Sequence, residues 1–246
     1  MIAPEDQPGS PTQYFMLHNL KQIRGHKLAA IDGEIGHVKD FYFDDKSWAI
    51  RYLVADTGNW LTGRLVLLSP YSFGRLDQDG KVLSINLTKK QIENSPSIDT
   101  DRPVSRQYEQ NYYNYYGWPT YWEGGGLWGA GEYPVFTPVD RPYDFQSYDY
   151  PRWEDIHLRS VNAVTGYDIQ ATDGALGSVS GFLVDQKKWQ IRELAVETGH
   201  WYSGKEILIT PAKVDHISYK ESKVFVKLSK KDLELTEEKH LATAGF

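Results

Sequence analysis

The sequence predicts a mainly β protein: two small antiparallel β-barrels, each followed by a short helix, joined by an aromatic-rich irregular connector. The chain of 246 residues contains an internal repeat at an offset of 141 residues, since Asp32 aligns with Asp173. Each copy reads as short β-rich segments separated by turn residues. Tyrosine, tryptophan, glycine and proline dominate the stretch between the copies. The predicted domains are barrels at 14–95 and 154–238 and a connector at 96–153, with terminal tails at 1–13 and 239–246.

The repeat runs without a gap, and about two dozen aligned positions are identical. Two copies of so long a unit are a duplicated domain, because a solenoid stacks at least about three short repeats. The identities include Gly36 with Gly177, Phe41 with Phe182, Asp44 with Asp185, Trp48 with Trp189, Arg51 with Arg192, Gly58 with Gly199, Leu67 with Leu208, and Pro70 with Pro211.

Each copy predicts five or six short strands and a closing helix. Asp32-Gly33 and Asp173-Gly174 suit tight hairpins, since glycine accepts the positive φ that such turns need. Thr88 to Gln91 resembles a capping box, and Ser229 to Asp232 is a weaker version of it. Closure into a small barrel would remove the exposed strand edges. The strands expected in the first copy are Leu28–Ile31, Ile35–Phe43, Ile50–Ala55, Leu65–Leu68, Phe73–Leu76 and Val82–Leu87.

These motifs resemble the PRC-barrel family. Both copies contain Asp-Gly-x-x-Gly-x-Val-x-x-Phe-x-x-Asp, then Trp-x-Ile-Arg-x-Leu, Thr-Gly-x-Trp and Leu-x-x-Pro, over residues 17–93 and 158–234. The family is named for the cytoplasmic domain of the photosynthetic reaction-centre H subunit and includes the C-terminal domain of a ribosome maturation factor. The resemblance implies a module that docks onto a membrane complex or a ribosomal protein and needs no cofactor. Such motifs specify a fold better than a function.

The connector has an extreme composition. Residues 108–153 hold 16 of the 34 aromatic residues and carry two basic and six acidic groups. Glycine and proline interrupt it throughout, which predicts neither helix nor strand. Either its rings pack on the outer faces of both barrels and hold them together, or they form an exposed recognition surface. The interaction residues that this predicts are Tyr112, Tyr113, Tyr115, Tyr116, Trp118, Trp122 and Trp128.

Two further features recur in both copies. Trp60 and Trp201 each lie between two glycines in a loop, where the ring either plugs a barrel end or projects toward a partner. Two acidic pairs, Asp44/Asp185 and Asp56/Glu197, recur close to a shared arginine, which predicts structural ion pairs or carboxylates that stabilise turns. The residues of these predicted ion pairs are Arg51, Asp56, Arg192 and Glu197.

Motifs for catalysis, cofactors or metals are not found in the sequence. The chain has no cysteine, and its seven histidines lack the spacing of a metal site. Gly124 to Gly129 matches a dinucleotide-binding pattern but follows no predicted strand. Gly177 to Gly181 has Val179 where a nucleophile elbow needs serine. We therefore expect no enzyme, no cofactor and no metal.

Charge and hydropathy limit the classes of partner and the location that the sequence predicts. No run of about 18 apolar residues or secretory signal is present, so we expect a cytoplasmic protein without a transmembrane segment. No segment is basic enough to favour nucleic acid. The sequence thus predicts a non-catalytic protein-interaction or assembly module that binds a protein, a peripheral membrane complex or its own copies. The alternatives are a ribosome-associated factor, supported by a weak lysine stripe at 220–231, and an enzyme with an unrecognised site.

Overall fold

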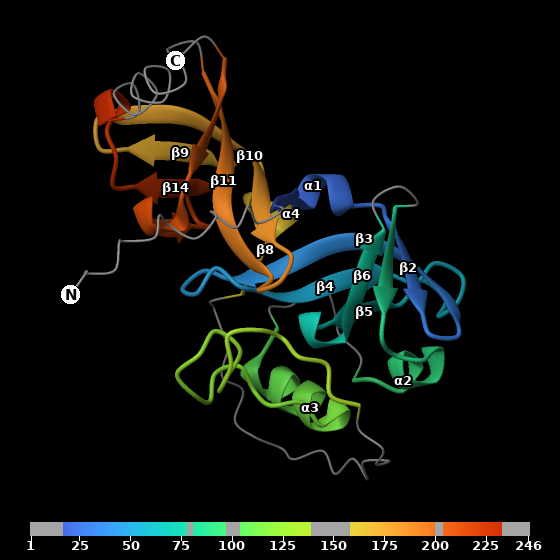
Figure 1. Ribbon diagram of the computed structural model, residues 1–246. Coiled ribbons are helices and arrows are strands. Elements are labelled where there is room, and N and C mark those ends of the chain that lie inside the picture. Colours follow the sequence, from blue (N-terminus) through green and yellow to red (C-terminus); the bar gives the residue numbers. More distant parts are fainter. Residues whose placement is uncertain (1–16, 78–80, 97–103, 139–157, 200–203, 233–246) are drawn as a thin grey trace, which may run out of the picture.

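The computed structural model describes residues 17–77, 81–96, 104–138, 158–199 and 204–232. Within them the chain is mainly β, as predicted. Its strands form two seven-stranded sheets, each the centre of one lobe (Figure 1). Both predicted tails lie outside the described residues.

The first sheet has the strand order β5-β4-β3-β2-β7-β6, and β8 pairs with the far end of β3. A short helix, α2 (Lys89–Glu93), follows its last strand and begins with the predicted capping box at Thr88 and Gln91. The strands are β2 (Lys27–Ala30), β3 (Gly33–Asp44), β4 (Ile50–Asp56), β5 (Leu65–Leu68), β6 (Phe73–Asp77), β7 (Val82–Ile85) and β8 (Leu158–Ser160).

The second sheet repeats this arrangement with the order β12-β11-β10-β9-β14-β13, and β1 pairs with the far end of β10. After its last strand, Ser229 and Asp232 exchange the hydrogen bonds of a capping box. The strands are β1 (Leu17–Asn19), β9 (Asp168–Ala171), β10 (Gly174–Asp185), β11 (Gln190–Thr198), β12 (Glu206–Ile209), β13 (Val214–Ser218) and β14 (Lys223–Val226). The other short helices are α1 (Leu20–Ile23), α4 (Val161–Val164), η1 (Pro70–Ser72) and η3 (Pro211–Lys213).

The sheets differ in two respects from the predicted antiparallel barrels. Each contains one parallel pair, β2 with β7 and β9 with β14, because the last hairpin folds back beside the first strand. Among the described strands, no pairing joins the two ends of either strand path, so hydrogen-bonded closure into a barrel is not seen. The expected hairpins at Asp32-Gly33 and Asp173-Gly174 are present between β2 and β3 and between β9 and β10.

The repeated glycines Gly36 and Gly177 are explained by a close approach of backbone to backbone. A Cβ at Gly36 would lie 2.0 Å from the carbonyl oxygen of Asp56, and one at Gly177 would lie 2.1 Å from that of Glu197. Their φ angles of 123° and 152° also favour glycine. Both residues lie near a β-bulge, which bends the long strand.

The prediction that no helix forms in the connector was wrong. Residues Arg106–Tyr116 form the helix α3, which lies on the side of the first lobe away from the second sheet (Figure 1). Ser105 caps its first turn, and Gly117, with φ 64°, ends it in the left-handed conformation. The tyrosines recur at helical spacing, so one face of α3 is buried. The glycine and proline residues elsewhere in the connector led to the prediction that no helix forms, although the tyrosines of this segment have helical spacing.

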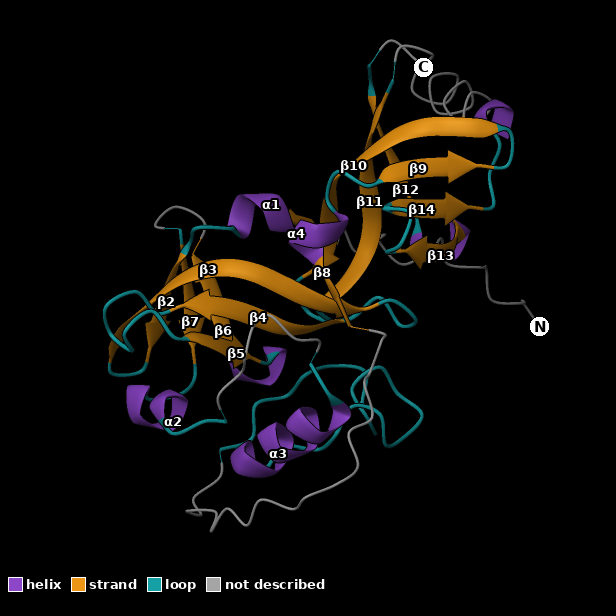
Figure 2. Ribbon diagram, turned by 180° about the vertical axis from the view of Figure 1, so that it is seen from behind, coloured by secondary structure: helices purple, strands orange, loops and turns teal. Residues whose placement is uncertain are grey.

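The two sheets exchange strands reciprocally. β1, which precedes the first sheet in the chain, pairs with β10 of the second, and β8, which precedes the second sheet, pairs with β3 of the first. Both registers are equivalent: Leu17 lies opposite Asp185, and Leu158 lies opposite Asp44. Helices α1 and α4 follow the exchanged strands and lie between the lobes (Figure 2). This is the pattern of an isologous, approximately twofold interface within one chain.

Backbone hydrogen bonds continue this junction at its centre. The N–H of Ile50 donates to the carbonyl of Trp189, and the N–H of Ile191 donates to that of Trp48, each over 2.7 Å. Both tryptophans have positive φ, 59° and 50°, which is unfavourable for a bulky side chain. The hydrogen bonds offset that cost. Aromatic packing across the junction also stabilises it, with the ring centroids of Phe43 and Phe182 5.6 Å apart.

The interface is symmetric in backbone but not in side chains. On one side, the buried Asp40 carboxyl accepts hydrogen bonds from the Ser160 hydroxyl (2.5 Å) and the Asn162 N–H (3.0 Å). At the equivalent position on the other side stands Gly181, against the Asn19 side chain. A carboxyl group at both positions would crowd Asn19. The two halves are therefore no longer interchangeable.

We predict that Gly181→Ala destabilises the protein by about 1 kcal/mol, the typical cost of losing a helix cap. The new Cβ would lie 3.0 Å from Asn19 Oδ1 and displace the side chain that caps α1. Gly125→Ala is the matched control, because a Cβ there meets nothing within 4 Å. Urea unfolding followed by circular dichroism measures both, and equal stability of the two variants would contradict the prediction.

A pH-dependent prediction concerns Asp40. Burial raises the pKa of this carboxyl above its ordinary 3.8, against the opposing hydrogen bonds from Ser160 and Asn162. The folded state therefore binds the proton more tightly, and stability from this group falls as pH rises from 3.8 through the raised pKa. The unfolding free energy of Asp40→Asn, relative to the unsubstituted protein, should increase as the pH rises from 3.8 through the raised pKa. Ser160→Ala keeps the carboxyl and should show no such relative gain, so a gain in both variants would refute this account.

Candidate functional site: an aromatic cluster and an open groove

Helix α3 covers the edge of the first sheet. The Tyr112 hydroxyl donates to the carbonyl of Leu67 (3.1 Å) and accepts from the N–H of Ser69 (2.9 Å), so it satisfies backbone groups at the end of β5. Tyr112 and Tyr113 are fully buried. An edge strand with unpaired backbone groups can pair with another chain, and α3 covers the edge strand β5 of this sheet.

A buried carboxylate lies under the helix. Glu109 is fully buried and accepts hydrogen bonds from the hydroxyls of Tyr52 and Tyr121, each over 2.8 Å. Its second oxygen lies 3.0 Å from Nη1 of Arg106. Burial and then the nearby Glu109 charge raise the pKa of both tyrosines well above the ordinary value of 10.0, which keeps the two hydroxyls as donors. A buried charge needs such partners to be tolerated.

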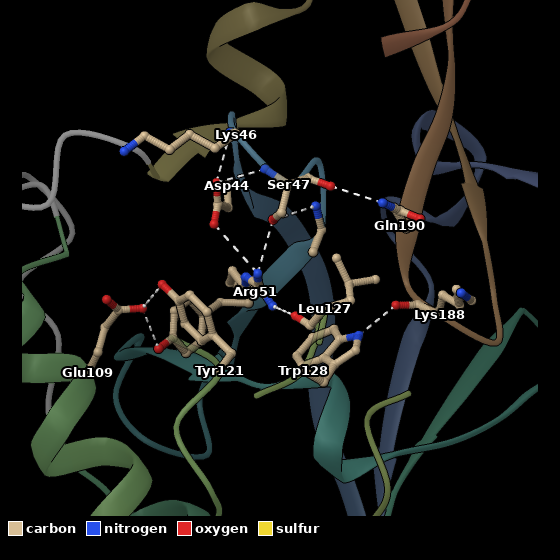
Figure 3. A network of polar contacts seen from close by, with 12 residues as sticks. Asp44, Lys46, Ser47, Arg51, Glu109, Tyr121, Leu127, Trp128, Lys188 and Gln190 are labelled. Atoms are coloured by element: carbon tan, nitrogen blue, oxygen red, sulfur yellow. Dashed lines mark hydrogen bonds and ion pairs between the residues drawn. The ribbon is translucent and has the colours of Figure 1, made fainter. Parts of the chain in front are cut away.

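Arg51 is the centre of a network of polar contacts beside this carboxylate (Figure 3). Its guanidinium donates to the carbonyl of Leu127 (2.8 Å) and the hydroxyl of Ser47 (3.0 Å), and it lies 3.5 Å from the Asp44 carboxylate. The Tyr121 ring stacks on it, with the centroid 3.7 Å from Cζ. Only 3% of the Arg51 side chain is exposed. Stacking and hydrogen bonding together suit a desolvated arginine.

The connector also reaches the second sheet. The Trp128 indole N–H donates to the carbonyl of Lys188 over 2.8 Å (Figure 3), and the Lys188 ammonium pairs with Glu132 at 3.0 Å. The aromatic cluster thus packs mainly on the first sheet and contacts the turn between β10 and β11. Of the two interpretations of the connector, packing describes residues 104–138 better than an exposed surface.

The predicted interaction residues divide by exposure. Five are buried in this cluster: Tyr112, Tyr113, Tyr116, Trp118 and Trp128. Tyr115, Trp122 and Trp60 remain partly exposed. The Lys89 ammonium lies 4.9 Å from the Trp60 ring. Trp201 lies outside the described residues.

Both predicted arginines form ion pairs with the repeated aspartates and not with Asp56 or Glu197. Arg51 pairs with Asp44, and Arg192 pairs with Asp185 at 3.1 Å. Although burial alone would raise it, the pKa of Asp44 is lowered by Arg51 and by two backbone N–H groups. Asp56 instead accepts from the N–H of Gly58 in the following turn. Among the described residues, neither Asp56 nor Glu197 forms an ion pair, because each lies on the opposite strand end from its arginine.

Sequence reasoning missed an open groove of about 1070 Å³ between the lobes. One wall is the turn 45–48 of the first sheet, and the other comes from β11, η3 and β13 of the second. Arg192 lies in it with 37% of its side chain exposed. Burial raises the pKa of the neighbouring Glu193. A comparison of the two repeats could have found it, because small or polar residues replace Tyr52 and Tyr71 there.

Comparison with known proteins agrees with the sequence resemblance in part. Residues 18–92 match the model of the PRC-barrel domain. A protein of Deinococcus radiodurans, described as an uncharacterized protein, is 32% identical over 84 residues, which are 34% of this chain and 30% of that protein. The chain thus covers less than a third of that relative's length. The match to the PRC-barrel domain thus covers β2 to β7 of the first sheet.

The described residues contain neither a group of three His, Cys, Asp or Glu side chains that could hold a metal ion nor a helix long and apolar enough to cross a membrane. The described site therefore consists of a largely buried aromatic cluster on the first sheet and an open groove beside the second.

We expect Trp128→Ala to destabilise the protein by about 3–5 kcal/mol, the usual cost of removing a buried tryptophan. The indole is 1% exposed and contacts both Tyr71 and the Lys188 carbonyl. Trp122→Ala, at a partly exposed position of the same segment, should cost clearly less. Guanidinium unfolding monitored by far-ultraviolet circular dichroism compares them, and a loss at Trp122 as large as that at Trp128 would argue against this packing.

Proposed function

We propose that this chain is a non-catalytic protein-interaction and assembly module built from two PRC-like units, 14–95 and 154–238. The groove between the lobes is the observation that carries the proposal. The matching strand orders of the two sheets and their equivalent exchanged strands support a second unit. The PRC-barrel match of the first unit is consistent with a docking role.

The groove suits a binding site because both of its walls are fixed. Strand exchange through β1 and β8 holds the two sheets at one separation, so little conformational freedom is lost when a partner binds. Its lining combines apolar groups such as Trp48 and Ile217 with charged groups such as Arg192 and Glu193. A hydrophobic centre with a few placed polar groups is the usual composition of a recognition site.

The partner that we propose is a protein or a protein-containing membrane complex, as the resemblance to the reaction-centre H subunit implies. The partly exposed rings of Trp60, Tyr115 and Trp122 would add contacts outside the groove, and Trp201 stays a predicted contact. The cytoplasmic location also remains a prediction.

Site-specific photocrosslinking tests the proposal. A photoreactive amino acid is placed at Ala212 in the groove or at Lys90 on the exposed face of α2, and each full-length protein is expressed in its host and irradiated. One dominant protein crosslinked at position 212 and absent at position 90 is the expected result. No product at 212, or the same products at both positions, would contradict a binding groove.

A further inference from the structure

The groove is the second-sheet equivalent of the surface that the aromatic cluster covers on the first sheet. Residues 141 positions apart occupy the same places in the two sheets, as the strand orders and registers show. The cluster contacts Arg51, Tyr52, Ser69 and Tyr71. Their equivalents all line the groove: Arg192, Glu193, Thr210 and Ala212.

The far wall corresponds as well. On the first side, Trp128 closes the space by donating to the Lys188 carbonyl in the turn between β10 and β11. The equivalent turn between β3 and β4 forms the far wall of the groove and includes Ser47, the counterpart of Lys188. The groove therefore has the same two walls as the filled site, with no described segment between them.

The effect of the aromatic cluster is seen in the exposure of equivalent residues in the two sheets. Leu67, under α3, is 1% exposed, whereas its equivalent Leu208 on the edge strand β12 is 50% exposed. The side chain of Arg51 is 3% exposed and that of Arg192 is 37% exposed. Each arginine keeps its aspartate partner, but among the described residues only Arg51 also stacks on a tyrosine ring and donates to a backbone carbonyl. The second sheet thus leaves a leucine of its edge strand and an arginine exposed at positions that the aromatic cluster covers on the first sheet.

The differences between the sites define the ligand. Ala212 replaces Tyr71, whose ring stacks on Trp118, so the groove has room for a larger ring from the ligand. Glu193 replaces Tyr52, which donates to Glu109, so the ligand should present a donor there in place of a carboxylate. Gln190 already donates to the carbonyl of Ser47, so that carbonyl does not require an indole.

We propose that the groove binds an aromatic segment of a partner protein, with a tyrosine or tryptophan ring stacked on Arg192, a ligand carbonyl accepting from its guanidinium, and a hydroxyl or N–H donating to Glu193. This proposal rests on the proposed function and names its partner class. A second copy of this chain is a poor source of the segment, because its described aromatic cluster already covers its own first sheet.

A peptide of residues 118–133 is the probe, since it carries the ring and the carbonyl that contact Arg51 but lacks the Glu109 carboxylate. The chain's own segment should stay in place on the first sheet, because a tethered segment has an effective concentration in the millimolar range. Fluorescence anisotropy of the labelled peptide with the full chain should show saturable binding. A peptide with Tyr121→Ala and Trp128→Ala should not bind.

Arg192→Ala should weaken peptide binding about tenfold or more, as for a central interface arginine. Arg75→Ala, an exposed arginine on the first sheet, is the matched control and should leave binding unchanged. Ala212→Trp fills the groove from the other side and should also abolish binding. Circular dichroism of each variant confirms that it is folded.

Failure of the peptide to bind would overturn the proposal, and so would three further results. The first is equal affinity for the substituted peptide, and the second is binding that neither Arg192→Ala nor Ala212→Trp reduces. The third is a dimer in sedimentation velocity that Arg192→Ala dissociates, since the occupant would then be a second copy. If the peptide fails while position 212 still crosslinks a partner, only the aromatic mode is wrong. If the peptide binds but no partner is crosslinked, the assembly function fails and the site stands.

Discussion

The reciprocal exchange of β1 and β8 is the constraint on which the rest of the structure depends. Each is only three residues long and would be unstable alone, yet each satisfies the backbone groups at the far end of a long strand in the other sheet. The backbone bonds at Trp48 and Trp189 repeat the exchange at the centre. Two sheets that would otherwise be joined by a long connector thereby become one body with a groove of fixed width.

The junction between the two sheets is symmetric in its backbone pairing and asymmetric in its side-chain contacts. Asp40 is held by Ser160 and Asn162, whereas Gly181 makes room for Asn19. An asymmetric pair of contacts favours pairing between unlike units over pairing of like ones. The same divergence separates a filled surface around Arg51 from an open one around Arg192. The covered surface contributes to the packing of the first sheet, and its counterpart is the surface for which we propose a role in recognition.

The cluster on the first sheet shows why an aromatic segment binds such a surface. Its rings bury area, but the polar atoms fix its position: Tyr112 on the β5 edge, Glu109 beneath Tyr52, and Arg51 between Asp44 and Leu127. Satisfied buried polar groups specify one arrangement more strongly than apolar contact does. A partner segment in the groove would be recognised by the same physics, with Glu193 reversing one donor and acceptor pair.

Local sequence determined much of the fold. The repeat, the hairpins at Asp-Gly, the strand positions and the capping box at Thr88 follow from residues that set their own backbone conformation, and periodicity marks them along the chain. The partners of those strands did not follow, because β1 pairs with β10 across 168 residues, as its Leu17 and Asp185 show. Helix α3 was hidden by a composition rich in tyrosine and glycine, although Ser105 and Gly117 mark its ends. The groove, and the contrast between Arg51 and Arg192, arise only in three dimensions, because burial is decided by which segment covers a surface and not by the surface residues themselves.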